Sequence, residues 1–95
     1  MSSVVKIGFA HLYITDEFKY MHNLDHITMK LCHIHERAFE YLKKANTIIL
    51  EHCSFTNDCL RYLPTGLETI KIYRPVHKIN EGLIYLKGIE NVHID

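Results

Sequence analysis

Several features that mark common functional classes are scarce or missing in this sequence. Its 95 residues carry 11 Lys and Arg against 11 Asp and Glu, so the chain has no net charge at pH 7. A neutral chain has no basic field with which to hold nucleic acid or an anionic membrane surface. No apolar run approaches the roughly 20 residues of a membrane-spanning helix, and the first residues, MSSVVKIGF, lack the pattern of a secretory signal. We therefore expect a single domain, 1–95, that binds neither nucleic acid nor membrane.

Cysteine is sparse, and its count is odd. Three cysteines do not make a complete disulfide framework of the kind that stabilises small secreted proteins. Cys32 and Cys53 hold the same place in successive segments, and adjacent strands would bring them close enough to bond. We expect them instead to be buried free thiols that behave as small apolar residues. Free thiols indicate a reducing compartment, so we predict a cytoplasmic location.

The sequence does contain a pattern that repeats at a nearly constant step. Segments that begin at residues 2, 24, 45, 67 and 89 can be overlaid, with steps of 22, 21, 22 and 22 residues. A sustained period of this length is typical of a solenoid, in which similar units stack along one axis. We therefore divide the chain into repeats at about 2–23, 24–44, 45–66 and 67–88, with a partial unit at 89–95.

Each unit combines two apolar spacings. Its first half has apolar residues two apart, such as Ile48 and Leu50, which lie on one face of a strand. Its second half has them three apart, such as Leu60 and Leu63, which indicates a helix. The spacings predict strands near 4–8, 26–30, 47–51, 69–73 and 91–94. They predict helices near 15–22, 36–43, 57–63 and 80–87.

The repeated unit resembles a known family. The resemblance is carried by the segments Leu24-x-x-Ile27-x-Met29-x-x-Cys32 and Ala45-x-x-Ile48-x-Leu50-x-x-Cys53. They are similar to the leucine-rich repeat, and the cysteine resembles its cysteine-containing class, although Pro75 takes the cysteine's place in the next unit. The resemblance implies an α/β solenoid of about four and a half repeats, with a parallel β-sheet on the concave side and short helices on the convex side. It also implies a non-catalytic protein–protein interaction module.

Two subgroups of the family imply alternative functions. Repeats of the cysteine-containing class are typical of F-box substrate adaptors, which would make the chain an adaptor fragment of a ubiquitin ligase, although no F-box helices precede the array. The stretches Val5-Lys6-Ile7-Gly8-Phe9 and Cys32-x-Ile34 resemble the small mitochondrial proteins that are similar to ATP synthase coupling factor B. This second resemblance implies a small mitochondrial assembly or coupling-factor subunit.

Strand alternation predicts which side chains point outward on the concave face. The candidate partner-binding residues are Lys6, His26, Thr28, Lys30, Ile49, Glu51, Lys71, Tyr73 and His93. Lys30 and Glu51 fall in one cross-strand column, so they can pair with each other. An exposed tyrosine favours protein contact, because Tyr is enriched where partners dock. We favour a protein-binding surface over a merely solvated sheet face.

Metal binding and catalysis find little support in the residues. His11 and His33 would stack in neighbouring turns, with His35 nearby, but the sequence supplies no fourth ligand for tetrahedral zinc. Whether these three histidines hold a metal stays open. There is no glycine-rich phosphate loop, no Gly-x-Ser-x-Gly and no Cys-x-x-Cys. We predict no catalytic residue, no metal and no cofactor.

Both ends of the array are expected to be uncovered. The outermost strands of an open sheet leave backbone groups unpaired, and an end unit exposes apolar residues that its neighbour would hide. Three explanations stay open: the chain is a fragment, it pairs edge to edge with a copy of itself, or a larger assembly covers its ends. We favour a partner at the C-terminal edge, because the last strand has no helix after it.

Overall fold

Strands and short helices alternate along the chain. The structure, a computed structural model, describes the backbone of residues 4–20 and 23–95 and the side chains of residues 13–16, 18–20 and 23–95. The strands are β1 (Val4–Ile14), β2 (His26–Ile34), β3 (Thr47–Glu51), β4 (Thr69–Tyr73) and β5 (Asn91–Ile94). The 3-10 helices are η1 (Glu17–Tyr20), η2 (Ala38–Tyr41), η3 (Asn57–Tyr62) and η4 (Glu81–Leu86).

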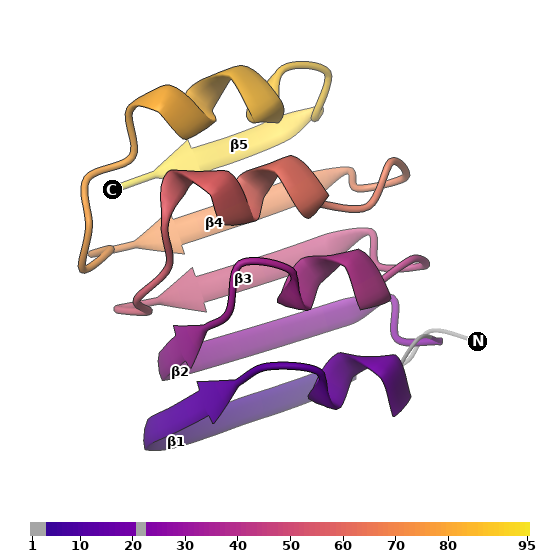
Figure 1. Cartoon of the computed structure of the whole chain (residues 1–95). Helices are drawn as coiled ribbons and strands as arrows, with labels where there is room; N and C mark the ends of the chain where they lie inside the picture. The colour runs from indigo at the N-terminus through magenta and orange to yellow at the C-terminus, as the bar shows by residue number, and fades with distance from the viewer. Residues whose placement is uncertain (1–3, 21–22) are drawn as a thin grey trace.

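The five strands form one parallel sheet in which strand order follows sequence order (Figure 1). The helices lie together along one side of this sheet (Figure 1). Partners on adjacent strands are one unit apart in sequence, so Ile27 lies opposite Ile48, which lies opposite Ile70. The prediction of an α/β fold with a parallel sheet and short helices is confirmed. The predicted ranges 47–51, 69–73 and 91–94 are the observed strands.

Alternate side chains of each strand build the core between sheet and helices. In β3, Ile48 and Leu50 are completely buried, whereas Ile49 between them is half-buried. Phe39 and Leu60 enter the same core from the helical side. Burial of a side chain of this size stabilises a fold by about 1.5–3 kcal/mol. The packing that stabilises the fold therefore lies on one face of the sheet.

The strands β1 and β2 continue beyond their predicted ends. Their pairing shifts register between Gly8 and Leu12 and then resumes as far as Ile14. In β2, the backbone of Leu31 has a φ of 56°, which bends the strand without ending it. The Ile34 amide then donates to the carbonyl oxygen of Ser54 at 2.8 Å, so the segment beyond the bend is bonded to the next unit. The predicted ends at residues 8 and 30 are therefore too early.

The helical segments are shorter and tighter than predicted. All four are 3-10 helices of four or six residues, which corrects the expected ranges 15–22, 36–43, 57–63 and 80–87. Apolar residues three apart fit a 3-10 helix, whose rise of about 2.0 Å per residue also covers the sheet with fewer residues. At the starts of two helices, Asn80 accepts a hydrogen bond from the Glu81 amide at 2.7 Å, whereas the Thr56 side chain makes no capping bond. Among the described residues, none of the helices has the length and apolar character needed to cross a membrane.

The three cysteines belong to the core. All three are buried thiols that take part in no disulfide, as expected for Cys32 and Cys53. Burial raises the pKa of the Cys53 and Cys59 thiols. A raised pKa disfavours the thiolate, which is the reactive form, so these side chains act as apolar packing groups.

Candidate functional site: the open face of the sheet

The face of the sheet turned away from the helices, called the open face below, carries the predicted binding residues in columns. The first column holds His26, Thr47, Thr69 and Asn91; the second holds Thr28, Ile49, Lys71 and His93; the third holds Lys30, Glu51 and Tyr73. Column neighbours are Cα partners on adjacent strands, close enough for their side chains to interact. The structure therefore brings together every predicted residue whose side chain it describes. The Lys6 backbone lies opposite Thr28, but its side chain is outside the described residues.

The exposure of these columns matches their place on the open face. Along β3 and β4, half-buried residues alternate with completely buried ones. Lys30 and His93, which lie in β2 and β5, are exposed. Ile49 places an aliphatic side chain in the middle of this otherwise polar surface, with Thr28 and Lys71 beside it. The open face is thus accessible to a partner and mixed in chemistry.

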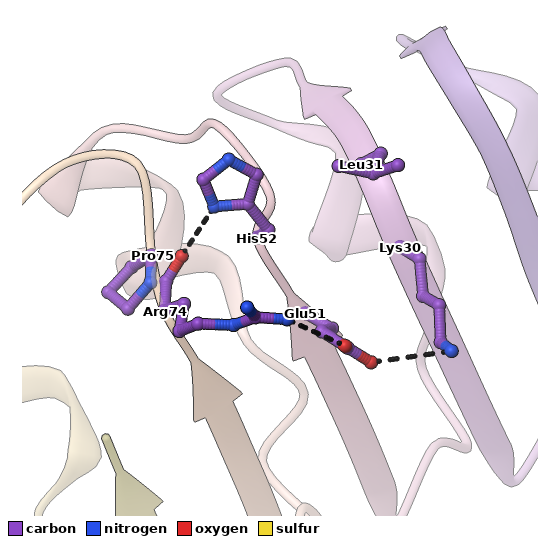
Figure 2. Close-up of a pocket in the computed structure, with 6 residues that line it drawn as sticks. All are labelled: Lys30, Leu31, Glu51, His52, Arg74 and Pro75. Atoms are coloured by element: carbon purple, nitrogen blue, oxygen red, sulfur yellow. Dashed lines mark hydrogen bonds and ion pairs between the residues drawn. The ribbon is translucent and has the colours of Figure 1, made fainter.

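Three charged side chains meet at one end of the third column (Figure 2). Lys30 Nζ lies 3.5 Å from Glu51 Oε2, and Arg74 Nη2 donates to Glu51 Oε1 at 3.3 Å. The Lys30–Glu51 pair was expected from the sequence and is confirmed, whereas Arg74 was missed. Exposed ion pairs contribute at most about 1 kcal/mol each, so this cluster matters more for surface charge than for stability.

Arg74 was missed because the backbone breaks the strand alternation at its position. Three residues occupy equivalent places in successive units: Leu31 follows Lys30 within β2, His52 follows the end of β3, and Arg74 follows the end of β4. Their φ angles are 56°, 49° and 45°. Alternation would turn these side chains toward the core, yet all three are exposed. A left-handed residue other than glycine costs about 1–3 kcal/mol. None of the three is a Gly or Asn, the residue types that would have signalled this backbone in the sequence.

The left-handed residues help to line a hollow of about 460 Å³ at the ends of the strands. Its walls are formed by Lys30, Leu31, Glu51, His52, Arg74 and Pro75 (Figure 2). His52 Nδ1 lies 2.9 Å from the Arg74 carbonyl oxygen. Because a carbonyl oxygen only accepts, Nδ1 must carry the hydrogen of this bond, which leaves Nε2 available. The bond fixes the ring at the rim of the hollow.

Two aromatic rings, those of Tyr73 and His93, lie at the end of the third column opposite Lys30. The rings of Tyr73 and His93 lie 5.1 Å apart between centroids and are tilted by 45°. His93 also lines a smaller hollow of about 320 Å³ together with Thr69 and Lys71. Tyr73 therefore stands between two concave places on the surface. A ring in such a position suits contact with another protein.

The histidines proposed as metal ligands are engaged with other groups where the structure describes them. The His33 ring stacks on Tyr13 with 5.7 Å between centroids. His35 Nδ1 accepts a hydrogen bond from the Arg37 amide at 3.3 Å. Over the part of the chain that the structure describes, there is no group of three or more His, Cys, Asp or Glu able to hold a metal ion. The His11 side chain is outside that part.

The last unit of the chain exposes apolar residues whose equivalents are buried. Val92 is 43% exposed, whereas its strand partner Ile70 is completely buried. In the same way, Leu83 in η4 is 48% exposed and Leu60, its equivalent in η3, is 1% exposed. β5 is an edge strand of the sheet. This apolar surface is where a further stacked unit, of the same protein or of another chain, would pack.

Comparison of the chain with protein-family models, with curated proteins and with solved structures finds no match.

The open face is the surface that the described residues equip best for contact. It combines a bridged charge cluster, an aromatic pair and one half-buried aliphatic residue, Ile49. Such a mixture is typical of a surface that recognises another protein.

Proposed function

We propose that this chain is a leucine-rich repeat protein of the cysteine-containing class that serves as a non-catalytic protein–protein interaction module. The observation that carries the proposal is the register of the sheet. Ile27, Ile48, Ile70 and Val92 stand side by side on successive strands, one unit apart. Units stacked in this way form an extended surface that repeat proteins use for binding. The open face is then the concave side of the solenoid and receives the partner.

The composition of the open face supports a protein as the ligand. Half-buried Tyr73 and Ile49 supply apolar contact area, and the polar side chains around them supply hydrogen bonds and charge. Interfaces commonly combine a central apolar contact with a polar rim. A neutral chain offers no comparable surface to nucleic acid.

The exposed end of the array supports a further contact. The uncovered Val92 and Leu83 lie where one more stacked unit would bury them. A further unit of the same protein, a second copy of the chain or a subunit of a larger assembly would cover this apolar surface and pair with the edge of β5. Light scattering after size-exclusion chromatography measures this directly. A monomer at all concentrations would remove self-association from the proposal.

The open-face proposal is tested by affinity capture with matched variants. The test variant is Tyr73→Ala with Lys30→Glu, on the open face. The control variant is Tyr20→Ala with Lys87→Glu, which makes the same chemical changes at an exposed residue of η1 and at the exposed residue that follows η4. Capture from cells by the wild-type chain, followed by quantitative mass spectrometry, identifies the proteins that each variant retains or loses.

We expect at least one protein to be retained by the control and reduced about tenfold or more by the test variant, because aromatic and charged anchors carry much of the energy of an interface. Partners retained equally by both variants would contradict binding through the open face. The identity of the partner then distinguishes between the two alternative functions. Subunits of mitochondrial complexes would indicate a coupling-factor role, and ubiquitin-ligase subunits would indicate an adaptor role.

A further inference from the structure

From the charge cluster beside the bend of β2 and the ends of β3 and β4, we infer that the open face receives an acidic segment of the partner. Specifically, a partner Asp or Glu side chain next to an aliphatic residue would dock in the hollow lined by Lys30, His52 and Arg74. This inference rests on the proposed function, since it names the chemistry of the segment that the open face receives.

The first support is the balance of charge around the hollow. Its walls hold two cationic side chains, Lys30 and Arg74, and a single carboxylate, Glu51. The hollow therefore has an excess of one positive charge, whereas the chain as a whole is neutral. A focused excess of one sign attracts and orients a ligand group of the other sign.

The second support is how the charges are layered. The side chains of Lys30 and Arg74 are 57% and 71% exposed, whereas that of Glu51 is 32% exposed. An approaching segment therefore meets the cations before it meets the carboxylate. Arg74 contacts Glu51 through Nη2, and a guanidinium has five N–H donors, so it can bind a second carboxylate at the same time.

The third support is the backbone that presents these groups. Left-handed conformations at Leu31, His52 and Arg74 keep their side chains exposed at the rim of the hollow. The His52 ring is held by its bond to the Arg74 carbonyl oxygen, which leaves Nε2 as an additional polar contact for the ligand (Figure 2). Leu31 is 46% exposed and, with Pro75, gives the hollow an apolar wall. That wall is the reason for expecting an aliphatic residue beside the acidic one.

Glu51 then acts as an internal competitor. It occupies one contact of each cation, at 3.5 Å from Lys30 Nζ and 3.3 Å from Arg74 Nη2, and it repels an incoming carboxylate. Removing its charge while keeping its shape should therefore strengthen binding. A purely structural role for the cluster makes no such prediction, because the loss of an exposed ion pair only removes a small stabilisation.

The experiment titrates the isotope-labelled full chain with synthetic peptides and follows backbone amide resonances. The acidic peptide contains three copies of Ser-Glu-Leu-Asp with an acetylated start and an amidated end, so that only side chains supply carboxylates. A neutral peptide replaces Glu and Asp by Gln and Asn, and a basic peptide replaces both by Lys. A single-stranded oligonucleotide of the same net charge as the acidic peptide tests whether any polyanion suffices.

We expect the acidic peptide to shift the amides of Lys30, His52 and Arg74 saturably and to bind at least about tenfold more tightly than the neutral one. Binding should weaken as salt is raised from about 0.05 M to about 0.5 M. Glu51→Gln should tighten it about three- to tenfold, whereas Glu81→Gln, an equal change at an exposed residue of η4, should leave it unchanged. Arg74→Glu should abolish it, and Arg61→Glu in η3 should not.

Several results would overturn the inference. These are the absence of saturable shifts at the hollow with the acidic peptide, weaker binding by Glu51→Gln, or equally tight binding of the oligonucleotide at the same residues. If the neutral or basic peptide shifts the same open-face amides more strongly, the acidic chemistry is wrong while binding through the open face stands. If the acidic peptide shifts only amides of the helical segments, both the inference and the open-face proposal are contradicted.

Discussion

The two faces of strand β3 share a backbone and differ in almost everything else. Ile48 and Leu50 on one face are completely buried, whereas Ile49 and Glu51 on the other are half-buried and reach the surface. The buried face supplies packing energy, and the open face supplies exposed polar, charged and aromatic groups. Under the proposed function, stability and recognition depend on separate sets of residues, so each can be changed without the other.

The same comparison can be made along the axis of the stack. In its middle, a neighbouring unit covers each apolar residue of the core, as η4 covers Leu60. At the C-terminal end of the described sheet, Leu83 and Val92 keep the residue types of a core but nearly half of their surface is exposed. The burial of Leu83 and Val92 therefore depends on a further unit. This is expected of a stacked architecture, in which each unit is stabilised by contact with its nearest neighbours.

The largest contrast is expected between adjacent residues of β3. Leu50→Ala should lower the free energy of unfolding by about 2–5 kcal/mol, because it leaves a cavity in a completely buried site. Ile49→Ala, on the open face, should lower it by less than about 1 kcal/mol. Chemical denaturation monitored by circular dichroism measures both. Equal losses would show that the two faces are not divided as described.

A smaller contrast is expected between equivalent residues of two units. Leu60→Ala should destabilise the chain more than Leu83→Ala, by about 1–3 kcal/mol, because Leu60 is 1% exposed and Leu83 is 48% exposed. The two substitutions remove the same atoms, so each serves as control for the other. Repeating the denaturation over a range of protein concentrations shows whether self-association covers Leu83. Equal losses of unfolding free energy for the two variants at every protein concentration would contradict the exposure of Leu83.

The smallest effect concerns the buried thiols. Burial raises the pKa of Cys53 and Cys59 above the ordinary value of about 9.0. The unfolded chain then binds fewer protons than the folded chain once pH passes about 9.0, so the free energy of unfolding should fall as pH rises through the alkaline range and be unaffected by these groups below it. Denaturation at about pH 8 and about pH 10 tests this.

Cys59→Ala provides the control for the thiol prediction. It should make the alkaline fall in stability shallower, because one of the two shifted thiols is gone. A fall as steep as that of the wild-type chain would show that Cys59 does not contribute.

Much of the fold could be predicted from the sequence because the apolar residues repeat at a fixed step. That step places Ile27, Ile48 and Ile70 in one column, and strand alternation then assigns the open face. The helix type could not be predicted in the same way, since a spacing of three residues fits a 3-10 helix as well as one turn of an α-helix.

The part of the site that escaped prediction depends on backbone angles. Leu31, His52 and Arg74 have left-handed conformations, which their residue types do not indicate. Alternation continued through these positions would assign Arg74 to the core, so its bond to Glu51 could not be foreseen. The longer pairing of β1 with β2 was missed for a related reason, because it resumes after a bend and an irregular register.

The measurement that tests the stacked parallel sheet most directly is a set of nuclear Overhauser contacts between backbone protons in solution. We predict contacts that place Ile48 between Ile27 and Ile70, in the pattern of parallel strands, without the close Hα–Hα contacts of antiparallel pairs. Strong Hα–Hα contacts between these strands, or no contact among the three isoleucines, would contradict the stack and the open face built on it.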